Sequence, residues 1–276
     1  MEKVLEYVNN SFESAEEQAA FDVYDANNIN PLYGFFVARA GLGASESMRS
    51  KLAEYNDPRL SRAFITKQGT SGKEQAPGTA DNAVYAPNGT PEQGTSKYGT
   101  SLFMYSISAP TLLLSYHELK FLEAEALCRL ERDAKSALKD AVVAGLLNAE
   151  NSFTISRKEL GKTLINAASS ITEAEAESYF DNTIEAKYTA EPLKTTMTQK
   201  YFALWGASGE ATESYNDVRR MKGLGENFIE LKNPNSFPLR CPYGNSDTTT
   251  NAEVKAAYGN GQYVYSENVW WAGGSR

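Results

Sequence analysis

The chain has little of what metal sites, disulfide frameworks and nucleic-acid surfaces require. It holds one histidine and two cysteines, and Cys128 and Cys241 are too far apart in sequence for a local metal clip. These residues are too few for a common zinc site. Acidic residues outnumber basic ones, and a formal net charge of -8 excludes a nucleic-acid partner held by a basic surface. Cys128 falls in an apolar helical pattern that favours a buried thiol, although a disulfide with Cys241 stays open.

Long apolar runs are also missing. No stretch approaches the roughly 20 residues that a membrane-spanning helix needs. The opening residues 1–7 lack the basic and apolar regions of a signal peptide. We therefore interpret the start either as that of a cytoplasmic protein or as the start of a fragment.

Catalytic motifs are equally scarce. Ser115, His117 and Glu118 have the residue types of a hydrolytic triad, but their spacing on a helix does not bring them to one point. A surface or hydrogen-bonded role for His117 is favoured. The stretch from Gly223 to Phe228 lacks the last glycine of a dinucleotide-binding loop. A pair of carboxylates for glycoside hydrolysis stays open, but we expect a binding protein and not an enzyme, with no cofactor and no metal.

The strongest regular signal is helical. Apolar residues at helical spacing, helix-capping patterns and a proline at a first turn predict helices over residues 112–130, 134–148, 157–169, 173–187, 192–206 and 210–221. The capping patterns begin at Ser156 and Thr172, and Pro192 suits the first turn of its helix. Gly206 and Gly209 predict a break. Short turns between successive helices predict a mainly α, tetratricopeptide-like α-α superhelix with long irregular loops.

Composition divides the chain into three regions. Residues 1–110 are rich in loops, residues 111–232 hold the paired helices, and residues 233–276 form an irregular tail. The stretch 66–100 is rich in Gly, Pro, Ser and Thr and has almost no aliphatic residues, so it does not form a packed element alone. A loop of this length suggests either a functional or a disordered segment.

Six segments, in order along the chain, resemble motifs of the SusD/RagB-like family. They are Asn56–Leu60 (NDPRL), Ser115–Ala126 (SYHELKFLEAEA), Gln199–Gly206 (QKYFALWG), Glu213–Arg220 (ESYNDVRR), Phe237–Tyr243 (FPLRCPY) and Asn268–Trp271 (NVWW). Tyr215 and Val218 stand where the family usually has Trp and Tyr. Each segment is modestly specific, but six in the same order are strong. The chain resembles the C-terminal portion of the family and lacks its N-terminal part.

The resemblance implies a role and a location. Members of this family are cell-surface nutrient-binding lipoproteins that cover a SusC-like, TonB-dependent transporter. We therefore expect a protein on the outer-membrane surface that binds oligosaccharides or polysaccharides and delivers them to that transporter. Its lipid anchor would lie on a Cys that this chain does not contain. The resemblance also favours the fragment interpretation of the start, and nothing about it suggests a nucleic-acid partner.

A second hypothesis is a helical-repeat interaction protein that recognises peptides. Sugars need accessible rings with flanking polar groups, whereas peptides need a groove with groups that pair with a backbone. For the first hypothesis we predict ligand contacts by Tyr85, Tyr98, Phe103 and Tyr105, because these rings occur in a polar setting. The alternative for Phe103 and Tyr105 is a strand that leads into the central helix. Trp270 and Trp271 are weaker candidates, since they are expected to pack against the scaffold.

The matched motifs themselves favour a structural role. Glu123 and Glu125 lie in an apolar helix, where a buried carboxylate needs a cationic partner. We predict that Arg219 or Arg220 pairs with a carboxylate of this helix. The alternative is a solvated surface pair that contributes little to stability.

Overall fold

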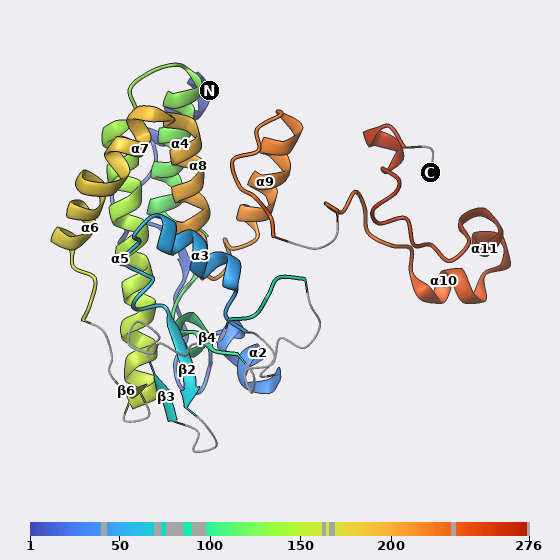
Figure 1. Ribbon diagram of the computed structural model, residues 1–276, viewed down its shortest axis with the longest axis horizontal. Coiled ribbons are helices and arrows are strands. Elements are labelled where there is room, and N and C mark those ends of the chain that lie inside the picture. The colour runs from blue at the N-terminus through green and yellow to red at the C-terminus, as the bar shows by residue number, and fades with distance from the viewer. Residues whose placement is uncertain are drawn as a thin grey trace. The chain divides into compact units, whose positions relative to one another are not determined.

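The computed structural model describes residues 1–39, 43–68, 73–75, 85–89, 98–161, 164–165, 169–232 and 236–274. The chain divides into two compact units, unit 1 (Met1–Leu231) and unit 2 (Lys232–Arg276). Unit 1 carries most of the helices (Figure 1). Within the described ranges, no helix is both long and apolar enough to cross a bilayer.

The centre of unit 1 is a hairpin of two helices, α4 (Tyr116–Arg129) and α5 (Lys135–Leu160), as Figure 1 shows. Ser115 begins α4, because its Oγ accepts a hydrogen bond from the backbone N–H of Glu118 at 3.0 Å. The short turn between the helices passes through Glu131, which has a left-handed φ of 57°. This turn folds the two apolar faces directly onto each other.

The other helices of unit 1 pack around this hairpin. They are α1 (Glu2–Val8), α2 (Pro31–Arg39), α3 (Glu46–Glu54), α6 (Glu173–Tyr179), α7 (Glu185–Ala190), α8 (Pro192–Ala203) and α9 (Glu213–Gly223), with a 3-10 turn, η3 (Leu102–Tyr105). A π-helical segment, η5 (Phe180–Ile184), joins α6 directly to α7. The predicted mainly α, tetratricopeptide-like fold is confirmed.

Two predicted helix starts, at Thr172 and at Pro192, are confirmed. The Thr172 hydroxyl accepts a hydrogen bond from the backbone N–H of Glu175 at 3.2 Å and so caps α6. Pro192 occupies the first turn of α8, where its missing N–H leaves no partner unsatisfied. The break after α8 also lies where predicted, and both of its glycines have a left-handed φ: 80° at Gly206 and 95° at Gly209.

The prediction of two separate helices over 134–148 and 157–169 is wrong, because α5 runs without interruption to Leu160. The Ser156 hydroxyl caps nothing. It lies within 2.9 Å of the carbonyl oxygen of Ser152, one helical turn earlier, and within 2.6 Å of that of Leu102. Phe153 is fully buried, so the apolar face of α5 continues through the supposed boundary. Beyond Gly161, only Leu164 and Ile165 of the predicted second helix are described, and they form a strand.

Another prediction needs correction at the start of α4. Residues 111–114 belong to a strand, β5 (Thr111–Leu114), and the helix begins only after Ser115. β5 pairs antiparallel with β1 (Ala19–Phe21). A second sheet has the order β4-β2-β3-β6, formed by β4 (Thr100–Ser101), β2 (Phe64–Gln68), β3 (Lys73–Gln75) and β6 (Leu164–Ile165).

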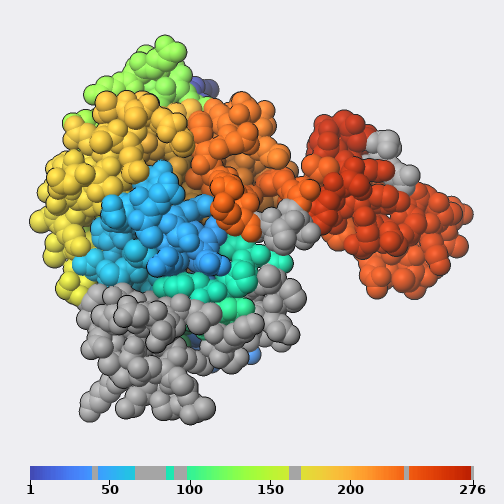
Figure 2. Space-filling view, viewed as in Figure 1, coloured from blue at the N-terminus to red at the C-terminus, as the bar shows by residue number. Residues whose placement is uncertain are grey.

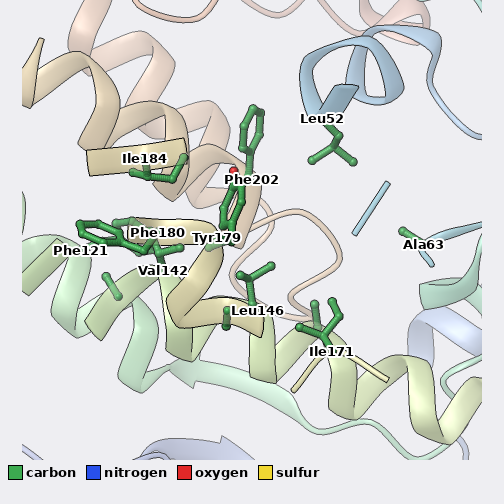
Figure 3. Close-up of a cluster of buried hydrophobic side chains, with 14 of the residues drawn as sticks. Leu52, Ala63, Phe121, Val142, Leu146, Ile171, Tyr179, Phe180, Ile184 and Phe202 are labelled. Atoms are coloured by element: carbon green, nitrogen blue, oxygen red, sulfur yellow. The ribbon is translucent and has the colours of Figure 1, made fainter. Parts of the chain in front are cut away.

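The core of unit 1 lies between the α4–α5 hairpin and the helices from α6 to α8. Figure 3 shows Phe121 of α4 beside Phe180 of η5, with Val142 of α5 close by. Phe121 and Phe180 are both fully buried. Burying a side chain of this size contributes about 1.5–3 kcal/mol to stability. Gly145 lets α5 approach α8 closely, since a Cβ at this position would lie 2.9 Å from the Cβ of Ala203.

The segment from α3 to residue 62 packs onto the same helices. In the space-filling view its blue surface adjoins the yellow surface that begins with α6 (Figure 2). The rings of Tyr55 and Phe202 meet edge to face with centroids 5.3 Å apart. Arg62 forms an ion pair with Glu175 at 2.9 Å. Residues 46–62 are therefore part of the helical unit.

Unit 2 holds two short helices, α10 (Asn245–Thr250) and α11 (Ala252–Tyr258), and a 3-10 turn, η6 (Trp270–Ala272). Tyr243 stacks on Tyr258 with ring centroids 4.3 Å apart. The guanidinium of Arg240 lies 4.6 Å from the centroid of the Tyr243 ring. No large hydrophobic side chain among the described residues of this unit is buried. Local stacking and helix capping, rather than a core, hold its described part.

Candidate functional site

Two of the four rings predicted to contact a ligand are buried. Phe103 is 3% exposed and packs against Phe153 and Trp205, with ring centroids 4.8 and 5.1 Å away. Gly206 is required there, because a Cβ at this position would lie 2.3 Å from the Phe103 ring. Tyr98 is 8% exposed. In this conformation both rings support the surrounding structure.

The other two rings, Tyr85 and Tyr105, are half-buried. Tyr85 contacts Phe64 edge to face at 5.2 Å, and the guanidinium of Arg49 lies 5.8 Å from its centroid. Burial raises the pKa of Tyr85, so its hydroxyl keeps the proton and remains able to donate a hydrogen bond. Tyr105 meets Phe36 edge to face at 5.0 Å. Residues 69–72, 76–84 and 90–97 of the predicted loop lie outside the described residues, and ligand contact by these rings stays a prediction.

Charged residues of three sequence motifs meet two charged residues outside the motifs, Arg129 and Glu226, in one chain of ion pairs that joins α4, α8, α9 and the residues just after α9. We call this chain the ionic seam. Its members are Glu118, Glu125, Arg129, Lys200, Asp217, Arg220 and Glu226. The seam joins residues up to 97 positions apart along the chain. The motifs thus converge in space because they hold helices together.

The pair between Arg220 and Glu125 confirms the predicted partnership of α9 with the central helix. Two parallel contacts join them, Nη1 to Oε1 at 2.5 Å and Nη2 to Oε2 at 2.8 Å. Glu125 is 4% exposed and also accepts a hydrogen bond from Arg129 Nε at 2.6 Å. Hydrogen bonding to Glu125 raises the pKa of Arg220 further above its ordinary value. Arg219, the alternative partner, lies instead over the ring of Tyr215.

Lys200 occupies the other end of the seam. It is 2% exposed, and its Nζ lies 2.8 Å from Asp217 Oδ2 and 3.7 Å from Glu118 Oε1. A buried ammonium without such partners would be strongly destabilising. Lys200 is therefore a structural cation and is not accessible to a ligand.

A second buried pair fixes the turn after α3. Arg59 and Asp57 are 2% and 3% exposed and are joined by two hydrogen bonds, at 2.6 and 2.8 Å. The remaining Nη1 of Arg59 donates to the carbonyl oxygen of Phe202 at 2.7 Å. The NDPRL motif thus ties this turn to the end of α8.

His117 and Glu210 form a buried acid and base whose facing atoms lack ordinary partners. His117 Nε2 lies 3.7 Å from Glu210 Oε2, and neither atom has a hydrogen bond within the described part of the chain. Burial lowers the pKa of His117 to about 3, with Arg59 and Lys200 adding to the effect. Burial and the adjacent Glu118 raise the pKa of Glu210 to about 8. At neutral pH, we therefore assign a neutral imidazole to His117 and a proton to Glu210.

A groove of about 630 Å³ lies between α5, the start of α4, α6 and segment 13–18, and we call it the α5 groove. Its floor is α5, its walls are α6 and the segment 13–18, and the start of α4 closes one side. Gln18 holds the segment in place, because its Oε1 accepts a hydrogen bond from the backbone N–H of Tyr116 at 3.2 Å. A hollow of this volume is within the usual range for small-ligand sites.

The described residues also show how the metal-ligating side chains and the cysteines are placed. No group of three or more His, Cys, Asp or Glu side chains among them is arranged to hold a metal ion. Cys128 is half-buried and Cys241 is exposed, and both are free thiols. The fold and the groove together describe a mainly helical scaffold with a ligand-sized hollow, which is the class of tetratricopeptide-like binding proteins.

Comparison with known proteins narrows that class. Residues 1–243 match the model of a SusD-like family described as "Starch-binding associating with outer membrane". The chain therefore belongs to the SusD-like family. A search of curated proteins found no match.

Solved structures agree with this assignment. The chain is 65% identical to a SusD/RagB family protein from Bacteroides thetaiotaomicron, with a TM-score of 0.89, over 100% of this chain and 59% of that one. It thus spans about three-fifths of that protein's length. A SusD homolog from Bacteroides fragilis is 19% identical (TM-score 0.60, 92% and 57% covered), and a chitin-binding protein is 20% identical (TM-score 0.56, 94% and 56% covered). These two likenesses concern the fold.

Sequence reasoning missed part of this picture. Glu210 and Glu226 lie outside the matched motifs, and only the folded chain brings them to His117 and Arg129. The α5 groove was missed because four separate segments of the chain line it, and no spacing pattern in the sequence links them. The unpaired acidic residues of segment 13–18 and α6 were the one signal available.

Proposed function

We propose that this protein binds glycans at the surface of the outer membrane and delivers them to a SusC-like, TonB-dependent transporter. The observation that carries the proposal is the family match over residues 1–243, because that family's description names starch binding and the outer membrane. The name of the chitin-binding relative supports a glycan ligand further. The α5 groove and the half-buried rings offer places for such a ligand.

Ligand contact is proposed for the four predicted rings, with Tyr85 and Tyr105 foremost. A sugar stacks on an aromatic face and directs its hydroxyls to nearby polar groups. Tyr85 meets this description, since Arg49 lies near its ring and its hydroxyl stays protonated. Tyr98 and Phe103 are 8% and 3% exposed, so their proposed part is to support the more accessible rings.

Delivery to a transporter is supported by physical reasoning and by the family. A binder tethered above a pore raises the local concentration of a large, slowly diffusing ligand there. The tether we propose is a lipid on a Cys in a part of the protein that this chain does not contain. The chain would then cover the transporter as a lid.

Binding measurements on a panel of oligosaccharides test the glycan part. We expect isothermal titration calorimetry with starch-derived and chitin-derived oligosaccharides to detect at least one ligand. Tyr85→Ala and Tyr98→Ala should each weaken it, by about 1–3 kcal/mol if a ring stacks on the sugar. Tyr7→Ala is the matched control, because Tyr7 is 62% exposed on α1. Unchanged affinity in both loop variants would show that the ring assignment is wrong.

The transporter part needs the full-length protein. Membranes that contain it should yield a co-purifying β-barrel transporter, and a transporter gene should lie next to its gene. If no barrel co-purifies and no such gene is adjacent, delivery to a transporter is wrong, and the peptide-binding interpretation becomes the better one.

A further inference from the structure

The α5 groove has more negative charge than its surroundings balance. Five carboxylates lie along it: Glu13, Glu16, Asp140, Glu173 and Glu177. None of them forms an ion pair with any residue that the structure describes. Among the described residues that line the groove, Lys139 is the one cation, and its Nζ is already bound to Asp181 at 2.8 Å. An anionic ligand would therefore be repelled, and a cationic one attracted.

The groove also has features that a mere group of acids lacks. Val143 and Leu147, one helical turn apart on α5, give it an apolar floor. The side-chain amides of Asn148 and Asn151 line it, and neither has a hydrogen-bond partner among the residues described here. His117, 1% exposed, forms part of its wall, with its Nε2 facing Glu210. Apolar contact and unpaired polar groups converge on one volume.

We propose that the α5 groove binds a cationic glycan, one whose sugars carry free amino groups, and rejects acidic glycans. This inference rests on the proposed function and adds a ligand charge and a site to it. The sugar's C–H face would lie on Val143 and Leu147, and its hydroxyls would bond to the amides. Its ammonium groups would pair with the carboxylates of α6 and of segment 13–18. The volume of the groove suits a small oligosaccharide better than the large contact that a folded protein partner needs.

The test compares three oligosaccharides that differ in charge: de-acetylated chitin oligomers, their neutral N-acetylated counterparts, and oligogalacturonate. At about pH 6, amino groups are protonated and ordinary carboxylates are ionised. We expect the de-acetylated oligomer to bind more tightly than the neutral one, and oligogalacturonate to bind least. In Glu173→Gln/Glu177→Gln the preference should fall on the order of tenfold, because two charges next to the ammonium groups are lost.

The matched control is Glu46→Gln/Glu213→Gln. It removes the same charge from first turns of α3 and α9, away from the groove, and should keep the preference. Hydrogen exchange supplies a second measurement that does not depend on a variant's folding. The de-acetylated oligomer should protect segments 13–18 and 139–151, which both line the groove.

The outcomes separate this inference from the proposed function. Two results would overturn the groove's role and leave glycan binding intact. In the first, the protein binds neutral and de-acetylated oligomers equally well. In the second, both double variants lose the preference for the de-acetylated oligomer to the same extent. Protection of the groove by a basic peptide but by none of the oligosaccharides would overturn it in favour of a protein ligand. If no glycan of any charge binds anywhere, the proposed function fails first.

Discussion

Helix α4 has two interfaces of opposite chemistry. Towards α5 and η5 it presents Phe121 and Ala124, both fully buried among other apolar side chains. Towards α9 it presents Glu125, which is bound by two arginines of the ionic seam. Burial of apolar area depends little on pH or salt, whereas partly exposed ion pairs depend on both. Helix α4 is therefore held to α5 by apolar packing and to α9 by ion pairs.

The largest effect should come from the apolar interface. Phe121→Ala should lower the free energy of unfolding by about 3–5 kcal/mol, because a ring that is 0% exposed leaves a cavity. Urea denaturation followed by circular dichroism measures this loss. Leu113→Ala is the control, since Leu113 is 70% exposed and its loss should change stability by less than about 0.5 kcal/mol. Equal effects of the two variants would contradict the assigned core.

The ionic seam should give the next largest effect. Glu125→Ala leaves Arg129 and Arg220 without their shared acceptor and should cost about 2–4 kcal/mol. The loss in free energy of unfolding caused by Glu125→Ala should be smaller at high salt, because salt weakens the ion pairs that the variant lacks. The loss caused by Phe121→Ala should not depend on salt. Denaturation curves at low and high salt for both variants would distinguish the two interfaces. A cost as independent of salt as that of Phe121→Ala would contradict the expected difference between the two interfaces.

The pH dependence should be smaller. Glu210 has an ordinary pKa of 4.5 and one of about 8 in the folded protein, so between these values the folded state binds more protons than the unfolded one. Stability then decreases as the pH rises through this window. His117, with a pKa lowered from 6.5 to about 3, acts in the opposite direction, but only below pH 6.5.

The range from pH 6.5 to 8 therefore isolates Glu210. Over it, the free energy of unfolding should decrease by roughly 1–2 kcal/mol, and Glu210→Gln should abolish most of that slope. Urea titrations across this range measure it. Glu213→Gln is the control, since Glu213 is only half-buried in the first turn of α9 and should leave the slope unchanged. An unchanged slope in Glu210→Gln would refute the raised pKa.

The smallest effect should come from an ion pair outside the seam. Lys194 and Glu191 lie 2.8 Å apart, with side chains 40% and 59% exposed. Lys194→Ala should change stability by about 0.5 kcal/mol or less. If Lys194→Ala lowered the free energy of unfolding as much as Glu125→Ala does, buried and exposed ion pairs would contribute equally to stability, contrary to this expectation.

The sequence allowed prediction of the elements whose signals are local. The Thr172 cap and the proline at the start of α8 depend on neighbours within one turn, and both were predicted correctly. The pairing of Arg220 with Glu125 was predicted because a carboxylate in an apolar helix needs a cation. Ser156 misled the prediction, because the same four letters that cap a helix also occur inside one when the hydroxyl has another acceptor.

The candidate sites were less predictable because they depend on distant parts of the chain. Phe103 looked accessible in a polar stretch, yet α5 extends far enough to cover it with Phe153. The α5 groove needs segments 13–18 and 173–177 to face each other across one helix. No local sequence pattern predicts that these segments lie close together. The burial of Phe103 and the shape of the α5 groove could therefore be known only from the folded structure.

The π-helical segment η5 has a consequence for how this region tolerates change in length. It widens one turn between α6 and α7, so that Phe180 and Ile184 are both fully buried although they are joined through a non-α turn. Further along, the Tyr188 hydroxyl accepts a hydrogen bond from the backbone N–H of Ala134 at 2.7 Å. Deleting one residue from this widened turn would let it close as an ordinary α turn and leave the helix after it in register, whereas the same deletion at the start of α7 would rotate everything after it by about 100° around the helix axis. A deletion within α7 would turn Tyr188 away from the turn between α4 and α5, so residues 180–184 should tolerate the loss of a single position better than α7 does.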